Sequence, residues 1–255
     1  MALAFLHRMQ DFFITVILWG YYILGFLFFF SFFYLVALCG GADREAAFQA
    51  LNHRLHRSFF TLLRVLVPRT QWRIASEVRE IRSSLIVANH RSFLDPIWFV
   101  SLFPRQKTIV KSAYFRYPVF GWILRRSGYV PSLATGLFTV AMADQIEKMR
   151  GYLAQGGNLF IFPEGTRSRD GRIGPFDPGT FKIARLCQAA SIQVLVIRNT
   201  EGLFPPDRFL FNTHEERVIS LELAGQLHPD YTSETFSLPA LMAEVRALME
   251  RKLER

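Results

Sequence analysis

The feature that most constrains this chain is a long uncharged segment near its N-terminus. From Phe12 to Cys39 there are 28 residues without a charged side chain, and eight of the 26 phenylalanines lie among them. As a helix rising about 1.5 Å per residue, the segment exceeds the roughly 30 Å hydrocarbon layer of a bilayer. We therefore expect a membrane anchor over residues 1–40, either spanning with tilt or bent at Gly20 and Gly25 into a re-entrant hairpin.

A cleaved signal peptide fits this segment less well. Its apolar region usually has about 7–15 residues and follows a basic stretch. Here the apolar region is longer, and only Arg8 and the titratable His7 precede it.

The distribution of basic residues predicts which side of the membrane the main domain occupies. Few basic residues precede the anchor, whereas five arginines follow it closely: Arg44, Arg54, Arg57, Arg64 and Arg69. Basic residues flanking an anchor favour the cytosolic side. We expect the main domain on the cytosolic face of a membrane, such as a bacterial inner membrane, with the lipid bilayer as a partner.

Residues 41–72 form a basic amphipathic segment. Arg57 and Arg64 lie off an apolar stripe at helical spacing, which is made of Leu55, Phe59, Leu62, Leu63 and Leu66. A helix lying on anionic lipid has this pattern. An ordinary amphipathic helix packed on the protein core has it too, and the sequence leaves both alternatives open.

Residues 73–255 alternate short apolar strands with helices, which is typical of an α/β layered sheet. The expected strands cover residues 83–90, 106–111, 128–132, 158–165, 192–199 and 217–225. The expected helices cover residues 96–103, 117–128, 134–157, 181–190 and 238–255. The chain is thus predicted to be an anchor, an interfacial segment and one globular domain.

The two cysteines exclude some kinds of site. Cys39 and Cys187 offer neither a disulfide framework nor a CxxC metal site. We interpret Cys187 as a small buried hydrophobic residue and not as a nucleophile.

A first group of polar residues follows the strand at residues 83–90. His90 comes directly after the apolar run, so we expect it at the carboxyl edge of the sheet, where α/β folds place ligands. Asp95 follows five positions later. An alternative explains Asp95 without chemistry, because an aspartate before Pro96 is a suitable N-cap for a helix that begins with proline.

A second group follows the strand at residues 158–165. Glu164, Gly165, Thr166 and Arg167 leave this strand at the same expected sheet edge. Arg167 is the better candidate to hold an anion, because a guanidinium group binds phosphate through two parallel hydrogen bonds. The sequence Asp170-Gly171 indicates an exposed turn.

Three sequence blocks resemble a known family. The block NHRSFLD matches the N-H-x4-D signature of the glycerolipid acyltransferases of the lysophosphatidate acyltransferase type, and FPEGTRS matches their second signature. Between them, KSAYFRYPVFGW has Lys111, Pro118 and Gly121 at the family's usual spacing. The resemblance runs from about Ser83 to Val196, and it implies a mixed sheet with flanking helices.

This resemblance implies a mechanism and its partners. His90 would be the general base that deprotonates the hydroxyl of a lysolipid acceptor, and Asp95 would hold the other nitrogen of its imidazole. Glu164 to Arg167 look like the acceptor-binding motif, and Lys111 is a further candidate for contacting substrate. The acyl donor would be acyl-CoA or acyl-carrier protein, and no metal or bound organic cofactor is implied.

The chain departs from the family pattern in two places. Many relatives carry an arginine a few residues after the block GYV, whereas here no arginine follows until Arg150. Leu195 stands where the family's fourth block usually has a proline. We expect the acceptor to be lysophosphatidate, which would become phosphatidate, and the first departure leaves a lyso-ornithine lipid or another lysolipid as the alternative.

Two other classes of function are alternatives to acyl transfer. A non-catalytic lipid-binding protein on the same fold would keep its function when His90 is replaced by alanine. Binding to nucleic acid is suggested by the net charge of +9 alone, since the aromatic residues concentrate in the anchor and no nucleic-acid motif is recognised. We expect no nucleic-acid partner.

Overall fold

The structure is a computed structural model that describes residues 2–40, 43–131 and 140–254. The chain forms two compact units, each built from separate segments. Unit 1 comprises Met1–Ile74, Arg91–Pro104 and Ile197–Ser220, and unit 2 comprises Ala75–His90, Arg105–Val196 and Leu221–Arg255. The predicted boundaries of anchor, interfacial segment and domain stay predictions.

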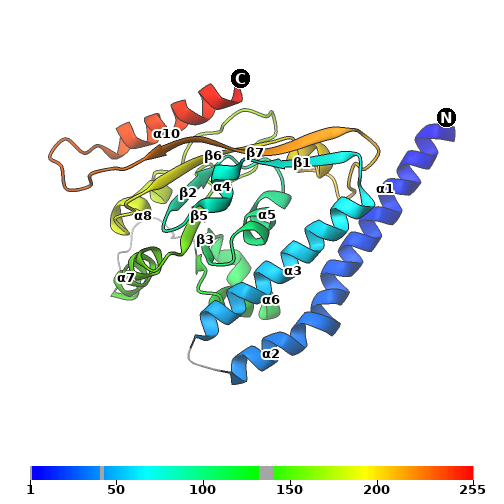
Figure 1. Ribbon diagram of the computed structural model, residues 1–255, viewed down its shortest axis with the longest axis horizontal. Coiled ribbons are helices and arrows are strands. Elements are labelled where there is room, and N and C mark those ends of the chain that lie inside the picture. Colours follow the sequence, from blue (N-terminus) through cyan, green and yellow to red (C-terminus); the bar gives the residue numbers. More distant parts are fainter. Residues whose placement is uncertain (1, 41–42, 132–139, 255) are drawn as a thin grey trace. The chain divides into compact units, whose positions relative to one another are not determined.

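Seven strands among the described residues form a sheet in the order β1-β7-β6-β2-β5-β3-β4 (Figure 1). β2 pairs in parallel with β5 and β6, and β3 pairs in parallel with β5 and β4. The predicted α/β fold with a mixed sheet is confirmed. The strands are β1 (Thr70–Ile74), β2 (Leu85–Ala88), β3 (Gln106–Val110), β4 (Val130–Pro131), β5 (Asn158–Ile161), β6 (Ile192–Arg198) and β7 (Arg217–Leu227).

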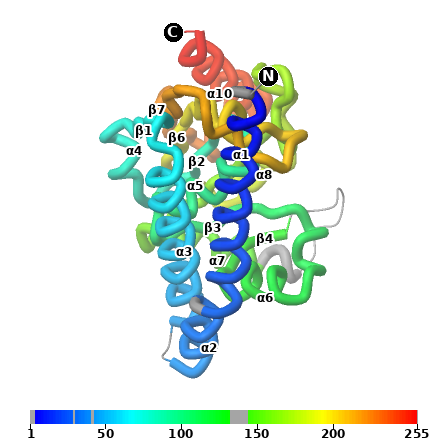
Figure 2. The backbone as a smooth tube through the Cα atoms, turned by 90° about the vertical axis from the view of Figure 1, so that its right-hand side faces the viewer, coloured from blue at the N-terminus to red at the C-terminus, as the bar shows by residue number. Residues whose placement is uncertain are grey.

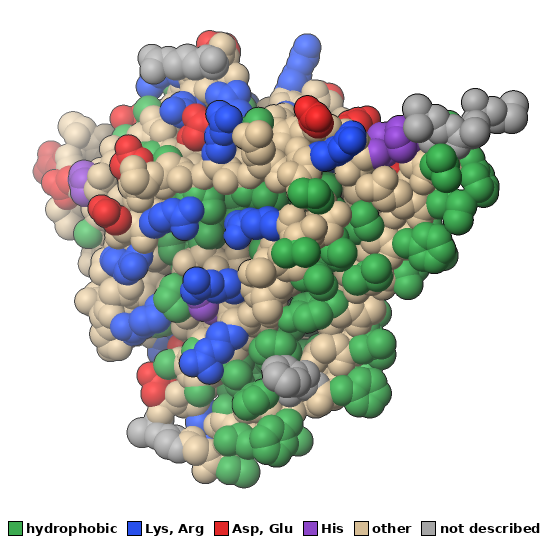
Figure 3. Space-filling model, turned by 45° about the vertical axis from the view of Figure 1, so that its right-hand side comes forward, with side chains coloured by type: hydrophobic (Ala, Val, Ile, Leu, Met, Phe, Trp, Pro, Cys, Tyr) green, Lys and Arg blue, Asp and Glu red, His purple; other side chains and the backbone are tan. Residues whose placement is uncertain are grey.

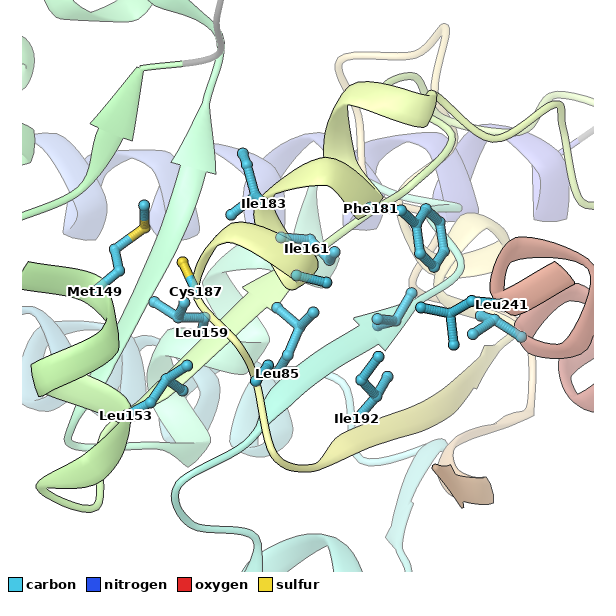
Figure 4. Close-up of a cluster of buried hydrophobic side chains, with 14 of the residues drawn as sticks. Leu85, Met149, Leu153, Leu159, Ile161, Phe181, Ile183, Cys187, Ile192 and Leu241 are labelled. Atoms are coloured by element: carbon cyan, nitrogen blue, oxygen red, sulfur yellow. The ribbon is translucent and has the colours of Figure 1, made fainter. Parts of the chain in front are cut away.

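The core of unit 2 lies between its strands and helices. Every residue of β2 and β5 is buried, as expected for strands covered on both faces. Leu85 and Leu159 of these strands pack with Phe181, Cys187 and residues of the other helices (Figure 4). The helical segments of unit 2 are α4 (Ser76–Glu80), η2 (Ser112–Arg116), α6 (Pro118–Arg126), α7 (Val140–Ala154), α8 (Pro178–Leu186) and α10 (Leu238–Leu253).

Unit 1 is dominated by one long helical stretch and the helix that follows it. α1 (Ala2–Gly20), the π-helical η1 (Tyr21–Phe30) and α2 (Ser31–Cys39) follow one another without a break. The chain therefore stays helical through both glycines of the expected hairpin, and the stretch changes direction near η1 (Figure 1). α3 (Arg44–Leu66) then runs back alongside it (Figure 2).

The apolar stripe of α3 faces protein. Leu55, Phe59 and Leu63 are buried, and α3 packs extensively on α5 (Leu94–Leu102). Of the two alternatives left by the sequence, packing on the core is the one that this stripe adopts. Asp43 caps the start of α3, since its carboxylate accepts the Ala46 N–H at 2.9 Å.

Polar side chains join the long helix to α3 along one face. The Tyr34 hydroxyl donates to Asn52 Oδ1 at 2.6 Å, and the Tyr22 hydroxyl lies 3.0 Å from His56 Nε2. His56 Nδ1 lies 2.6 Å from the Asn52 carbonyl oxygen, which can only accept. Nδ1 is therefore the protonated nitrogen of the neutral ring, and Nε2 accepts from Tyr22.

The opposite face of the long helix is exposed and apolar, and we call it the apolar face. Hydrophobic side chains gather over this helix in Figure 3. Among the described residues, Ala4–Cys39 is one helix long and apolar enough to cross a membrane, by length and composition alone. The exposed members of the apolar face are Phe5, Leu6, Met9, Phe12, Phe13, Val16, Ile17, Ile23, Leu24, Leu27, Phe28, Phe32, Phe33, Leu35 and Val36.

The predicted strands and helices after residue 73 each correspond to an element of the structure. The predicted helix over 134–157 is seen from Val140 onward, because residues 132–139 lie outside the described part. The sequence did not predict β1, α4, η2 or the short helix α9 (Thr200–Leu203). These are short elements, for which a periodic pattern has too few residues to show.

Candidate active site

The loop after β2 places His90 at the carboxyl end of a central strand of unit 2. β2 ends at Ala88, and its neighbours β5 and β6 both run parallel to it. His90 is half-buried. A side chain here lies where parallel sheets bind ligands, as the sequence predicted.

The loop after β5 carries the second group of residues to the same edge. β5 ends at Ile161, and the Gly165 N–H donates to the Phe162 carbonyl at 3.1 Å to close a tight turn. Gly165 has a φ of +63°, a left-handed conformation that a residue with a Cβ rarely adopts. The turn therefore requires glycine at this position.

Glu164 ties the two loops together. Its Oε1 accepts the His90 N–H at 3.0 Å, and its Oε2 accepts the Gly174 N–H at 2.8 Å. Both carboxylate oxygens thus bind backbone amides, which are strong charge-assisted bonds. This geometry makes Glu164 a residue that positions His90, and its predicted contact with the acceptor stays a prediction.

Two further contacts fix His90. Its carbonyl oxygen accepts the Ser168 N–H at 2.8 Å, and its ring stacks on Phe162 with centroids 4.5 Å apart and planes inclined by 25°. Both backbone groups and one ring face of His90 are therefore bound by the loop from Phe162 to Ser168. The expected convergence of the two strand ends is confirmed for His90 and Glu164.

The far side of this loop is supported by the C-terminal helix. Arg246 of α10 donates to the carbonyl of Ile173 at 3.2 Å and to the carbonyl of Gly174. Its guanidinium also lies over the Phe176 ring, 4.7 Å from the centroid. The Asp177 N–H donates to the Pro163 carbonyl at 2.7 Å. Arg246 therefore supports Gly174, which in turn donates to Glu164.

Asp95 belongs to unit 1 and is fully buried. Its Oδ2 accepts two backbone N–H groups that precede the helix, from Arg91 at 2.6 Å and from Ser92 at 2.7 Å. The first of these amides belongs to the peptide bond that directly follows His90. Asp95 thereby shapes the turn that leaves His90.

The interpretation of Asp95 as an N-cap is wrong. α5 begins at Leu94, its N-cap residue is Phe93, and no side chain caps it. Asp95 and Pro96 therefore lie within the first turn. The carboxylate turns back to the amides before the helix, because two closely spaced N–H groups there offer it better bonds than a single cap contact.

Ser92 and Arg91 hold the same turn within unit 1. The Ser92 hydroxyl donates to the Phe204 carbonyl at 2.7 Å and accepts the Leu94 N–H at 3.3 Å. Arg91 pairs with Glu201 at 3.4 Å. Ser92 is completely buried, so its hydroxyl needs these partners.

The remaining predicted site residues are more exposed. Thr166 and Lys111 are exposed, and Arg167 is half-buried. The side chains of Lys111 and Arg167 make no hydrogen bond or ion pair with any described residue. Both cations are available to an anionic ligand, and the structure does not place a ligand against either.

The turn after Arg167 is structural. Asp170 Oδ1 accepts the Arg172 N–H at 3.1 Å and the Ser168 hydroxyl at 3.2 Å. These contacts, the Arg172 amide foremost, lower the pKa of the Asp170 carboxyl below its usual value. Gly171 has a φ of +77°. Asp170 and Gly171 form the exposed turn that the sequence indicated.

The Cys187 thiol is buried. Burial raises the pKa of the Cys187 thiol to about 12, which keeps it protonated and unreactive at neutral pH. Within the described residues, no group of three or more His, Cys, Asp or Glu side chains is placed to hold a metal ion.

Sequence reasoning missed two supporting residues, Gly174 and Arg246. Gly174 is ten positions beyond Glu164, and Arg246 lies in the terminal helix. Neither belongs to a recognised block. A local pattern carries no signal for such long-range backbone contacts.

Comparisons with known proteins identify the family of this chain. A family model described as Acyltransferase matches residues 69–198, about half of the chain. A protein of Brassica napus named 1-acyl-sn-glycerol-3-phosphate acyltransferase BAT2, chloroplastic, is 41% identical over 133 residues, which are 52% of this chain and 38% of that protein. One of Helicobacter pylori named 1-acyl-sn-glycerol-3-phosphate acyltransferase is 30% identical over 156 residues, 60% of this chain and 63% of that protein.

A solved structure shares the fold over nearly the whole chain. The crystal structure of the 1-acyl-sn-glycerophosphate (LPA) acyltransferase PlsC from Thermotoga maritima matches with a TM-score of 0.72 and 18% identity, covering 96% of this chain and 97% of that one. The chain spans less than half the length of the Brassica protein. The family match includes both strand-end loops, and the chain belongs to the acyltransferase family.

Proposed function

We propose that the protein is a membrane-bound O-acyltransferase that moves a fatty acyl group from acyl-CoA or acyl-carrier protein to the free hydroxyl of a lysophospholipid. The observation that carries the proposal is the fixed position of His90 at the end of β2. Its N–H is bound by Glu164 and its carbonyl by Ser168. A base held in this way is oriented before the reaction begins, so little entropy is lost in orienting it.

The proposed reaction uses the acceptor's own hydroxyl as nucleophile. His90 removes the hydroxyl proton as the oxygen attacks the thioester carbonyl. The new C–O bond forms, the C–S bond of the tetrahedral intermediate breaks, and the imidazolium returns the proton to the departing thiolate. The products are an ester and a free thiol, so the step needs no metal, no organic cofactor and no covalent enzyme intermediate.

We propose that Asp95 orients the imidazole of His90. Its buried carboxylate binds the amide that directly follows His90, so the two residues share one turn. A carboxylate on one ring nitrogen fixes the tautomer and stabilises the imidazolium. Asp95 is thereby given a positioning role, and His90 the catalytic one.

Lysophosphatidate is the acceptor that we propose. The curated relatives are named 1-acyl-sn-glycerol-3-phosphate acyltransferases. Arg167 lies three residues beyond Glu164 and has no partner among the described residues, so its guanidinium is available to a phosphate. Lys111 is a second cation for the acceptor or donor.

A phosphate-free lysolipid, such as a lyso-ornithine lipid, is the second candidate acceptor. The specific observation is that the sequence after Pro131 carries no arginine before Arg150. Because residues 132–139 lie outside the described part, the missing cation is a fact of sequence alone. The same His90 chemistry applies to either acceptor.

We propose that the long helix embeds its apolar face in one leaflet, on the cytosolic side of a bacterial inner membrane. Its other face is joined to α3 by the Tyr22–His56 and Tyr34–Asn52 contacts. If the long helix spanned the membrane, α3 would enter the hydrocarbon layer with it, and so would the exposed Arg54 and Arg57. Burying guanidinium groups in hydrocarbon is costly, which favours insertion along the membrane plane.

The test is acyl transfer by purified full-length protein in vesicles. Acyl-CoA and acyl-carrier protein are compared as donors, lysophosphatidate and phosphate-free lysolipids as acceptors, and His90→Ala serves as the control. Product from lysophosphatidate that is lost in the variant supports the proposal. Product from a phosphate-free acceptor alone keeps His90 as base and replaces the acceptor.

Binding of lipid without turnover, unaffected by His90→Ala, would identify a non-catalytic lipid-binding protein. In the active enzyme, Arg167→Ala is expected to raise the acceptor KM about tenfold with a smaller change in kcat, since it removes a contact made in the bound complex. Equal KM values for lysophosphatidate in both proteins would remove Arg167 from the acceptor site.

A further inference from the structure

The middle of α1 is bound to the loop that precedes β7, and both belong to unit 1. Asp11 Oδ1 accepts the Thr213 N–H at 2.8 Å and the Thr213 hydroxyl at 2.7 Å. One turn further along, the Thr15 hydroxyl accepts the Phe211 N–H at 2.9 Å. These contacts place residues 205–215 against the first turns of the long helix.

An open depression of about 590 Å³ lies between them. Arg8 and Asp11 of α1 line one side, and residues 208–212, 214 and 215 line the other. None of its lining residues belongs to the loops that carry His90 and Glu164. Nothing in the acyl-transfer mechanism uses it.

Two arginines and two acidic residues line the depression, and both acidic residues already contact other residues of the protein. Asp11 is engaged by Thr213 and by His214, whose Nδ1 lies 3.3 Å from Asp11 Oδ2. Glu215 pairs with Arg217 at 2.7 Å. Both acidic groups are therefore occupied within the protein.

The two arginines that line the depression have no such partners. Arg8 and Arg208 make no side-chain hydrogen bond and no ion pair with any described residue. Two guanidinium groups without a side-chain partner on one concave surface can bind an anion, and their planar donors suit a phosphate.

The apolar side chains around the depression indicate which kind of molecule carries that phosphate. Phe5 and Phe12 lie one turn before and after Arg8 and are exposed members of the apolar face. Across the depression, Phe209 is 68% exposed and stacks on Trp19 with centroids 5.9 Å apart. A soluble anion needs none of this surface, whereas a lipid has chains to lay on it.

We propose that Arg8 and Arg208 bind the phosphate of an anionic phospholipid, whose acyl chains lie along the apolar face. The site rests on the proposed membrane association, and Arg8 and Arg208 are not among the residues proposed to bind the acceptor. Because it lies outside the catalytic loops, it makes membrane binding depend on lipid charge without taking part in the acyl transfer itself.

The test measures partition of the full-length protein onto vesicles of phosphatidylcholine with and without phosphatidylglycerol. Phosphatidylglycerol carries a phosphate but is neither the proposed acceptor nor its product. The variant is Arg8→Gln/Arg208→Gln. The matched control is Arg79→Gln/Arg251→Gln, which removes the same charge from exposed arginines of unit 2.

The proposal predicts that phosphatidylglycerol strengthens vesicle binding of the wild type and of the control. In the Arg8/Arg208 variant, the strengthening by phosphatidylglycerol should be about thirtyfold smaller. Binding to phosphatidylcholine alone should be equal in all three proteins, which shows that the variant is folded. Equal losses in variant and control would reduce the effect to net charge and overturn the site. Failure of the wild type to bind either vesicle would overturn it as well.

Two further arms separate the alternatives. Calorimetry with inorganic phosphate should give no binding that depends on Arg8 and Arg208; tight binding would assign the site to a soluble anion and overturn the lipid. The partition experiment is repeated with His90→Ala, which should bind like wild type. In the wild type, a lipid effect without acyl transfer would keep this site and refute the proposed enzyme, while acyl transfer without the lipid effect would do the reverse.

Discussion

The loops that hold His90 and the long N-terminal helix are stabilised in opposite ways. The His90 loop is bound through its backbone, with its N–H on Glu164 and its carbonyl on Ser168. The long helix is bound along one face only, by contacts such as Tyr34 to Asn52. Its other face presents exposed side chains, including Phe28 at 80% exposure.

This difference shows which region is complete within the protein. The backbone N–H and carbonyl of His90 and both carboxylate oxygens of Glu164 find protein partners, so the geometry of this turn is fixed before substrate arrives. An exposed apolar surface of this extent marks an interaction site, and we propose that lipid covers it on the N-terminal helix. Four predictions follow from this contrast, in order of decreasing effect.

Replacing phenylalanine with alanine should destabilise the protein strongly at a buried helical position and hardly at an exposed one. Phe60 of α3 is 1% exposed, whereas Phe28 is on the apolar face. We expect Phe60→Ala to lower the free energy of unfolding by about 3–5 kcal/mol, through lost burial and a cavity. Phe28→Ala should change it by less than about 0.5 kcal/mol. Urea unfolding in mild detergent measures both.

Vesicle partition completes this comparison. Phe28→Ser should weaken binding to vesicles while leaving unfolding in detergent unchanged, because its side chain contacts lipid and not protein. A clear loss of stability in Phe28→Ala would mean that protein covers this face.

The contact between α3 and the long helix should fail in acid. Burial, opposed by the Asn52 hydrogen bond, lowers the pKa of His56 from 6.5 to about 4. The unfolded chain therefore binds the proton first, so the stabilisation is complete above pH 6.5 and is lost as pH falls toward 4. The pKa difference corresponds to about 3 kcal/mol.

Unfolding measured against pH for the wild type and for His56→Gln tests this prediction. The glutamine variant should be less stable at pH 7 and should show a shallower decline between pH 6.5 and 4. His228 is exposed, so His228→Gln is a control that should keep the wild-type slope. Identical slopes in all three proteins would show that His56 is not buried neutral.

Asp95 should matter to both folding and turnover. Asparagine replaces a charged acceptor of two amides with a weaker neutral one, so we expect Asp95→Asn to cost about 2 kcal/mol of stability and to lower acyl transfer severely. Asp43→Asn is the matched control, since asparagine caps a helix about as well as aspartate.

Thermal unfolding and initial rates measured on the same samples separate the two effects. A variant that stays folded at the assay temperature and turns over normally would contradict the role of Asp95. Activity lost only where the protein unfolds would make its role structural.

Glu164 should act on catalysis through position. Glutamine has one carbonyl acceptor and can keep only one of the two bonds, to His90 or to Gly174. We expect Glu164→Gln to lower kcat about tenfold, because a small displacement of the base is enough to slow the step. Exposed Glu216→Gln is the charge-matched control.

The distinction between kcat and KM is informative here. A rise in acceptor KM with kcat unchanged would return Glu164 to the acceptor-binding role that the sequence suggested. Wild-type values for both would show that the backbone bonds do not control His90.

The sequence predicted the elements with strong patterns and the residues inside recognisable blocks. β2 and β5 are continuous apolar runs, and His90 and Glu164 follow them directly, so their meeting at one sheet edge could be expected. It could not predict Arg246, because a contact between α10 and the loop at Gly174 leaves no local signal. The N-cap interpretation of Asp95 failed because amides before the helix compete for the same carboxylate.

The most direct test of this account measures turnover and membrane binding together, in one vesicle preparation, for the wild type and His90→Ala. In His90→Ala we expect acyl transfer to fall about 10²–10⁴-fold, because a positioned base is lost, while vesicle binding stays unchanged. Unchanged turnover in His90→Ala would contradict the assignment of His90 as the base, and with it the proposed chemistry of the site.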